Sequence, residues 1–320
     1  MPEGAYDLKP LDPAKFKDPF VTAKGETRAW VELARLHTLW FNTGSLCNIE
    51  CANCYMDSSP KKDDLAYLSA PHVRKFLEEI KTLGLPTEEI GFTGGEPFMN
   101  KALPDMLGDV LERGFKALVL TNAMKPLWHK RSALLALKQR FGADRLTLRV
   151  SIDHPTPAIH EQERGPGAWA PLERSVKWLL EHGFKIDVAG RALFSHSEAE
   201  ARAAYQQLFD AWGLKLNAHN PARLVLFPEM DETLDVPEIT TACWGILNVR
   251  PDAQMCATSR MVVLRKGDNR PRVVPCTLLP YDPAFDLGET LAEAQGAVRL
   301  NHPHCAKFCV LGGASCSAGG

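Results

Sequence analysis

The strongest constraint on the fold is a repeated alternation between short β-rich segments and amphipathic helical segments. The β-rich segments lie at 38–43, 89–92, 116–121, 146–152, 184–190 and 223–227. Segments with apolar residues at helical spacing lie between them, at about 69–84, 106–113, 131–140, 171–182 and 198–211. Six such alternations over about 190 residues predict an α/β fold with a parallel sheet, which is either open or curled into a partial barrel.

The alternation divides the chain into three parts. Residues 1–37 form an N-terminal arm, residues 38–230 carry the alternation, and residues 231–320 consist of short segments punctuated by Pro, Gly and Cys. The last part is predicted to be a smaller, metal-stabilised domain. In parallel α/β sheets, functional residues lie in the loops at the C-terminal ends of the strands. Motifs in those loops are therefore the candidates for a functional site.

Charge and hydropathy exclude several classes of partner. The 320 residues carry a net charge of -2, and the basic residues are scattered rather than clustered. The N-terminal stretch lacks the pattern of a secretion signal, and no apolar run approaches the roughly 20 residues of a membrane span. We therefore expect a cytoplasmic protein with no nucleic-acid or membrane partner.

The nine cysteines fall into two groups. Three lie at Cys47, Cys51 and Cys54, directly after the first β-rich segment, and the other six follow residue 242. In a chain without a secretion signal these thiols are expected to be reduced, which favours metal or redox chemistry over disulfides. Three thiols in eight residues suit a structural zinc ion that takes a fourth ligand such as His72, or a four-iron cluster with one iron left open.

A second motif, Gly91-Phe-Thr-Gly-Gly-Glu-Pro-Phe98, follows the second β-rich segment. Two adjacent glycines, Gly94 and Gly95, allow a ligand to approach the backbone closely, and Glu96 places a carboxylate beside them. A glycine pair before Pro97 is by itself more often a turn. Its position after the cysteine loop in the strand–helix repeat favours a binding role.

The two motifs together resemble the radical S-adenosylmethionine (radical SAM) superfamily, in the branch of the molybdopterin-precursor, pyrroloquinoline-quinone peptide and sulfatase-maturing enzymes. The resemblance implies a partial (β/α)6 TIM-like barrel. It implies that Cys47, Cys51 and Cys54 hold a [4Fe-4S] cluster whose fourth iron binds S-adenosylmethionine. Reductive cleavage of S-adenosylmethionine then yields a 5′-deoxyadenosyl radical that abstracts hydrogen from a substrate. An electron donor such as flavodoxin or ferredoxin is implied as a partner.

The resemblance also implies a set of residues that contact S-adenosylmethionine. Ser151 contacts the ribose or amino-acid moiety, and Arg164, in the loop after Asp153, pairs with the methionine carboxylate. The family places an aromatic residue or His before the third cysteine, where this chain has Asn53, so Tyr55 is the candidate for the adenine contact. The complete implied set is Tyr55, Thr93, Gly94, Gly95, Glu96, Asn122, Ser151, Asp153 and Arg164.

The C-terminal cysteines resemble the twitch and SPASM auxiliary-cluster extensions, although this tail has six cysteines rather than the usual seven. The resemblance implies one auxiliary [4Fe-4S] cluster that accepts an electron or anchors the substrate. Its ligands are drawn from Cys256, Cys276, Cys305 and one of Cys309 or Cys316, with Cys243 as a spare. Structural zinc is the alternative for this tail. His302 and His304 flank Cys305 and are assigned no ligand role.

The substrate is left open between a small molecule and a peptide. Residues 1–37 are too short for an attached leader-binding domain, which favours a small molecule, or a peptide or protein that binds without such a domain. A ribosomal-peptide maturase that uses a separate recognition protein is the alternative. Candidate radical-quenching residues are Cys243, Tyr205 and Tyr281. A non-enzymatic iron–sulfur electron carrier, or a zinc-organised binding module, would account for the cysteines but not for the Gly94–Pro97 motif at a strand end.

Overall fold

The computed structural model describes residues 9–142, 144–192, 197–228 and 231–313, and the account that follows is restricted to them. Six parallel strands follow one another in the order of the chain. They are β2 (Thr38–Asn42), β3 (Glu89–Thr93), β4 (Lys116–Thr121), β5 (Leu146–Ser151), β6 (Lys185–Arg191) and β7 (Leu224–Phe227). Their bounds agree with the predicted β-rich segments to within one or two residues, and the predicted parallel α/β sheet is confirmed.

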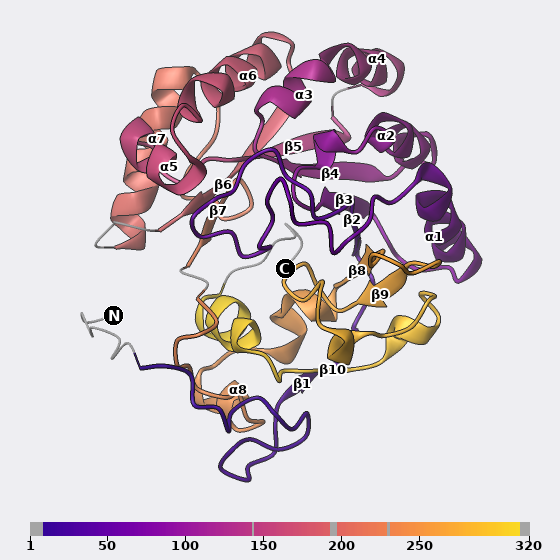
Figure 1. The fold of residues 1–320 in the computed structure, drawn as a ribbon, viewed down its shortest axis with the longest axis vertical. Coiled ribbons are helices and arrows are strands. Elements are labelled where there is room, and N and C mark those ends of the chain that lie inside the picture. Colours follow the sequence, from indigo (N-terminus) through magenta and orange to yellow (C-terminus); the bar gives the residue numbers. More distant parts are fainter. Residues whose placement is uncertain (1–8, 143, 193–196, 229–230, 314–320) are drawn as a thin grey trace.

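Helices connect the strands and lie along one face of the sheet (Figure 1). They are α1 (Ala70–Thr82), α2 (Leu103–Glu112), α3 (Lys125–His129), α4 (Arg131–Phe141), α5 (Pro157–Arg164), α6 (Trp169–Glu181) and α7 (Glu198–Trp212). The sequence did not predict α3 and α5. Helix α5 buries His160 and Glu163 rather than an apolar stripe, so it carries no hydrophobic period that a sequence pattern could detect.

The register of the strands brings their C-terminal ends to one edge. Asn42 at the end of β2 lies opposite Thr93 at the end of β3, and Thr121 at the end of β4 lies opposite Val150 in β5. Consecutive parallel strands joined by helical crossovers place all their following loops at this edge. The loop after β2, which holds the first cysteine group, therefore lies beside the loop that holds Gly94.

The C-terminal part of the chain extends this sheet. Strand β8 (Ser259–Val263) pairs in parallel with β2, and β9 (Arg272–Val274) pairs antiparallel with β8. Among the described residues the sheet has eight strands, in the order β7-β6-β5-β4-β3-β2-β8-β9. The N-terminal arm joins the same region, because β1 (Trp30–Val31) pairs with β10 (Val298–Arg299). Figure 1 shows β1, β10 and the short helix α8 (Cys243–Ile246) on the side of the sheet opposite α1–α7.

Alternating side chains of the strands supply two cores. Leu39 and Phe41 of β2 pack with the apolar faces of the helices, whereas Trp40 between them packs with the C-terminal part. The second core includes Met261 of β8 and three buried cysteines, so the C-terminal part is held by apolar packing as well as by the sheet. Burial of each such side chain contributes about 1.5–3 kcal/mol. No helix in the described residues is long and apolar enough to cross a membrane.

Candidate active site

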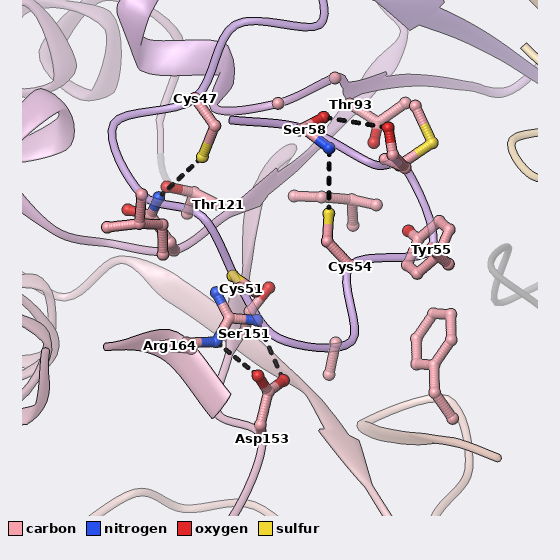
Figure 2. Close-up of a pocket in the computed structure, with 18 of the residues that line it drawn as sticks. Cys47, Cys51, Cys54, Tyr55, Ser58, Thr93, Thr121, Ser151, Asp153 and Arg164 are labelled. Carbon is pink, nitrogen blue, oxygen red and sulfur yellow. Dashed lines mark hydrogen bonds and ion pairs between the residues drawn. The ribbon is translucent and has the colours of Figure 1, made fainter. Parts of the chain in front are cut away.

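A cavity of about 110 Å³ lies at the C-terminal edge of the sheet, where the loops after the strands meet (Figure 2). Most of the residues predicted to bind the first cluster and S-adenosylmethionine line it. They are Cys47, Cys51, Cys54, Tyr55, Thr93, Gly94, Gly95, Asn122, Ser151, Asp153 and Arg164. The remaining predicted residue, Glu96, lies behind the wall.

The three thiols of the first group are free and lie on the loop after β2 (Figure 2). Two N–H groups face their sulfurs. The backbone N–H of Ser58 lies 3.4 Å from Cys54 Sγ, and Nδ2 of Asn122 lies 3.8 Å from Cys47 Sγ. Donors of this kind stabilise sulfur that carries negative charge, so the loop is prepared for coordinated thiolates.

The protonation of the thiols depends on what they bind. Burial raises the pKa of Cys47 to about 12, and burial likewise raises the pKa of Cys51 to about 11. These two side chains are therefore neutral thiols at pH 7 in the absence of a nearby cation. A bound metal centre reverses the preference, because its positive charge favours thiolate ligands.

The glycine pair after β3 packs directly against the cysteine loop. Gly94 has a φ of +145°, a conformation that side chains disfavour. A Cβ on Gly95 would lie 2.2 Å from the backbone oxygen of Leu46, and the N–H of Gly95 donates to the oxygen of Gly44 at 2.8 Å. Only glycine permits this approach, which leaves backbone rather than side chains to line the cavity.

Glu96 supports the cavity from behind. Its carboxylate accepts hydrogen bonds from the Thr121 hydroxyl at 2.9 Å and from the backbone N–H groups of Asn122 at 2.8 Å and Phe98 at 3.1 Å. Burial raises the pKa of Glu96 to about 7, although the three donors oppose this shift. The carboxylate thus connects the end of β3 to the end of β4 and fixes the position of Asn122.

Asp153 and Arg164 form a paired unit in the cavity (Figure 2). The guanidinium of Arg164 donates through Nε to Oδ2 of Asp153 at 2.7 Å and through Nη2 to Oδ1 at 3.0 Å. Arg164 is the last residue of α5, and the prediction that it lies in a loop was wrong because α5 has no apolar period. Ser151, the last residue of β5, is partly buried beside this pair.

Arg191, which sequence reasoning missed, lies on the same cavity at the end of β6. Its Nη2 donates to the backbone oxygen of Asn53, and its Nε lies 3.6 Å from Oδ1 of Asp153. Its Nη1 is buried with no hydrogen-bond partner among the described residues. The position of an arginine directly after a predicted strand was the signal that could have identified it.

Asn53 and Tyr55 occupy different surroundings. Nδ2 of Asn53 donates to Glu163 of α5 at 2.8 Å, so this residue attaches the cysteine loop to the helix. Tyr55 lines the cavity, and its ring stacks on Phe227 of β7 with centroids 5.4 Å apart. Tyr55 thus supplies a flat apolar surface beside the third cysteine. Asn53, the residue immediately before that cysteine, does not.

Four cysteines of the C-terminal group line a second, separate cavity of about 20 Å³. They are Cys256, Cys276, Cys305 and Cys309. Burial raises the pKa of Cys256 to about 11 and that of Cys305 to about 12, so these thiols too need a cation to ionise.

The other predicted residues of this region lie elsewhere. Cys243 lies in α8, where its sulfur faces the backbone N–H of Thr240 at 3.3 Å, and it does not line the second cavity. Cys316 lies outside the described residues. Of the suggested radical-quenching residues, Tyr205 is fully buried and its hydroxyl donates to the backbone at Ile152. The hydroxyl of Tyr281 donates to the backbone oxygen of Met56 at 2.7 Å.

A three-thiol loop and a glycine pair lie together at the edge of a parallel, barrel-like sheet. This arrangement defines a class of protein, and comparison with known families identifies that class. A profile of the Radical SAM superfamily matches residues 41–201, half of the chain, and the protein belongs to that superfamily. It is a radical SAM enzyme, with a [4Fe-4S] cluster and S-adenosylmethionine as its cofactors. This match favours an enzyme over the alternatives of a non-enzymatic electron carrier and a zinc-organised binding module.

Individual relatives cover only part of this chain. The antilisterial bacteriocin subtilosin biosynthesis protein AlbA of Bacillus subtilis is 29% identical over 175 residues, which are 54% of this chain and 37% of AlbA. GTP 3′,8-cyclase of Shewanella denitrificans is 26% identical over 152 residues, 47% of this chain and 43% of the cyclase. The chain thus matches less than half the length of these relatives.

A solved structure shows the same fold. SuiB of Streptococcus suis bound to S-adenosylmethionine aligns with a TM-score of 0.57 at 12% identity, over 80% of this chain and 63% of SuiB. The predicted fold class, a radical SAM partial barrel with a cysteine-rich C-terminal region, is confirmed. The division of the chain at residues 37 and 230 stays a prediction.

Proposed function

We propose that Cys47, Cys51 and Cys54 hold the cluster to which S-adenosylmethionine binds. The single observation that carries this proposal is the convergence of these three thiols with the backbone of Gly94 and Gly95 on one cavity. When bound, the reduced cluster and S-adenosylmethionine supply a 5′-deoxyadenosyl radical that abstracts hydrogen from the substrate. The chain contributes ligands, orientation and shelter from water.

We assign the remaining cavity residues to S-adenosylmethionine by their chemistry. The open backbone at Gly94 and Gly95, together with Thr93, faces the methionine amino group, and the carboxylate of Glu96 lies behind this wall. Ser151, Asn122 and Tyr55 face the ribose and adenine. The methionine carboxylate is met by Arg164, whose Nη1 is not used by Asp153, together with the buried, unpartnered Nη1 of Arg191.

We further assign an auxiliary [4Fe-4S] cluster to Cys256, Cys276, Cys305 and Cys309. Four thiols that line one cavity can hold a metal centre, and the resemblance of this tail to the auxiliary-cluster extensions favours a cluster over structural zinc. Such a cluster would accept an electron or anchor the substrate. Cys243 is not needed for this ligand set.

The substrate is proposed to be a small molecule or a peptide. A further cavity of about 480 Å³, lined by Cys54, Tyr55, Leu278, Tyr281 and His302 among others, offers it space next to the first cysteine loop. The names of AlbA and GTP 3′,8-cyclase support a peptide and a small molecule respectively, so a peptide maturase with a separate recognition protein stays within the proposal. The electron donor is proposed to be a flavodoxin or a ferredoxin.

The test is anaerobic reconstitution followed by two measurements on the same sample. We expect about eight irons per chain, and dithionite with S-adenosylmethionine should release 5′-deoxyadenosine. C51A should lose about four irons and all cleavage. C243A, which removes a cysteine outside both ligand sets, is the matched control and should keep both.

Two results would contradict the assignments. Absence of 5′-deoxyadenosine from an iron-replete sample would overturn the proposed site of S-adenosylmethionine cleavage. About four irons together with one zinc per chain, the zinc being lost in C276A, would overturn the auxiliary cluster in favour of structural zinc.

A further inference from the structure

Three side chains that are assigned to neither cluster converge on the wall of the third cavity, and one of them, His304, also lines the four-cysteine cavity. Glu232, His302 and His304 each place a ligand atom so that all three lie within 4.8 Å of one another. Glu232 comes from the segment after β7, about 70 residues before the histidines, so the fold rather than the sequence brings them together. The same cavity reaches Cys54 and Tyr55 of the first cysteine loop.

The two distances from the carboxylate to the imidazoles are longer than hydrogen bonds and close to the spacing of ligands on one ion. Oε2 of Glu232 lies 3.6 Å from Nε2 of His302 and 3.7 Å from Nε2 of His304. A hydrogen bond between such atoms would be about 2.7–3.2 Å long. Two ligands at about 2.0–2.1 Å from one tetrahedral zinc ion lie roughly 3.4 Å apart. The carboxylate is thus close to the spacing that a shared ion requires.

The ring of His304 is held within the protein, because the residue is only 5% exposed. The nitrogen that faces Glu232 is Nε2, at 3.7 Å from Oε2. An ion between these residues would therefore bind Nε2, and the ring proton would be on Nδ1. The support for the site comes from the fixed position of Nε2 beside the carboxylate.

The segment that carries Glu232 is fixed in place from two directions. Nζ of Lys307 donates to the backbone oxygen of Asp231, and the carboxylate of Asp231 accepts from the N–H of Thr233 at 2.8 Å. The ring of His302 packs edge-on against Phe285, with centroids 6.1 Å apart. The three side chains therefore do not need a rearrangement of the backbone to meet.

We propose that Glu232, His302 and His304 bind one divalent transition-metal ion of the Zn²⁺ type, separate from both iron–sulfur sites. Two imidazoles and one carboxylate form a ligand set that suits zinc and leaves coordination positions open. The open side faces the cavity that reaches the first cysteine loop. The ion acts there as a Lewis acid that holds an oxygen donor of the substrate, such as a carboxylate or carbonyl.

Binding of the ion replaces one hydrogen bond of the His302 ring with a bond to the metal. The backbone N–H of His304 donates to Nδ1 of His302 at 3.1 Å. The ring proton of His302 is therefore on Nε2, which points toward Glu232. Coordination through Nε2 moves that proton to Nδ1 and breaks this contact. The ion replaces it with a direct bond to the same ring.

The test uses the reconstituted protein with its clusters in place and Zn²⁺ as the probe. The protein is dialysed anaerobically against micromolar Zn²⁺, and zinc and iron are counted in the same sample. We expect one zinc per chain, with a zinc K-edge spectrum that has nitrogen and oxygen neighbours at about 2.0–2.1 Å and no sulfur at about 2.3 Å. E232Q and H302Q should each weaken zinc binding by about 100-fold with unchanged iron.

H219Q is the control: it removes an exposed histidine in the segment between α7 and β7. This variant should bind zinc as the unmodified protein does. Three results would overturn the proposal: no zinc in the unmodified protein, zinc with a sulfur shell, or zinc retained by both E232Q and H302Q. Because Glu232 is largely exposed, E232Q is expected to fold even where H302Q does not. The iron count and 5′-deoxyadenosine release test the proposed function separately.

Discussion

Arg164 and Asp153 form a two-bond pair inside the cavity, with Nε to Oδ2 at 2.7 Å and Nη2 to Oδ1 at 3.0 Å. The pair joins the end of α5 to the residues after β5, next to Ser151. Arg191 lies on the other side of the same carboxylate, at 3.6 Å. One buried carboxylate therefore positions two cations that face the first cysteine loop.

Replacement of Asp153 by Asn should destabilise the protein by about 3 kcal/mol, because it leaves two buried guanidinium groups without their counter-charge. The free energy of unfolding, measured anaerobically by urea titration, checks this. E112Q breaks the exposed ion pair between Glu112 and Arg140 and should cost less than about 1 kcal/mol. Equal effects of the two substitutions would contradict the importance of the buried pair.

The carboxylate of Asp153 contributes to the free energy of unfolding, and this contribution is lost in acid. Burial raises the pKa of Asp153, but the charges of Arg164 and Arg191 outweigh burial and leave the pKa below its ordinary value. A depressed folded-state pKa contributes stability above the unfolded-state pKa of about 3.9, and this stability is lost as the pH falls further. The stability difference between the unmodified protein and D153N should therefore be constant from pH 6 to 8 and should shrink below about pH 4.

Replacement of Gly95 by Ala should prevent assembly of the first cluster. The new Cβ would lie 2.2 Å from the backbone oxygen of Leu46, so the start of the cysteine loop has to move. We expect G95A to lose about four irons per chain. The control is G108A, inside α2, where the added Cβ meets nothing closer than 3.8 Å. It should keep its iron and gain about 0.5–1 kcal/mol in stability. Equal iron in the two variants would contradict the close-approach argument.

The sequence predicted those features that depend on local pattern. The six strands and the main helices follow from apolar periodicity, and the spacing of Cys47, Cys51 and Cys54 identified the first site. The sequence did not predict α5, whose buried residues are His160 and Glu163, because no apolar stripe marks that helix. The missed site residues, Arg191 and Glu232, lie far along the chain from their neighbours. Only the strand order and the packing of the C-terminal part against the sheet bring them together.

Replacement of Cys276 by Ala should remove the auxiliary cluster and leave the first one. We expect the iron content to fall by about four per chain, while reduced protein still cleaves S-adenosylmethionine without turnover of substrate. The measurement is the iron count combined with 5′-deoxyadenosine release. C243A again serves as the control, since its sulfur faces Thr240 outside the four-cysteine cavity. Loss of iron from C243A in place of C276A would contradict the proposed ligand set.

The affinity for S-adenosylmethionine should rise with pH up to about 7 and then level off. Burial raises the pKa of Glu96 to about 7, so its carboxyl is largely protonated at pH 6 and ionised at pH 8. The ionised form accepts the N–H of Asn122 and the hydroxyl of Thr121, and it adds a negative charge close to the proposed site of the methionine amino group. A ligand that binds the ionised form better gains up to tenfold in affinity per pH unit below the pKa.

The measurement is equilibrium binding of S-adenosylmethionine to the oxidised, reconstituted protein at pH 6, 7 and 8, without reductant, so that no cleavage occurs. E96Q cannot ionise at this position and should bind with an affinity that changes little over the same range. Its affinity should be closest to that of the unmodified protein at pH 6, where Glu96 is also neutral. Equal pH dependence in both proteins would place the titrating group elsewhere and would remove Glu96 from the proposed set of ligand-binding residues.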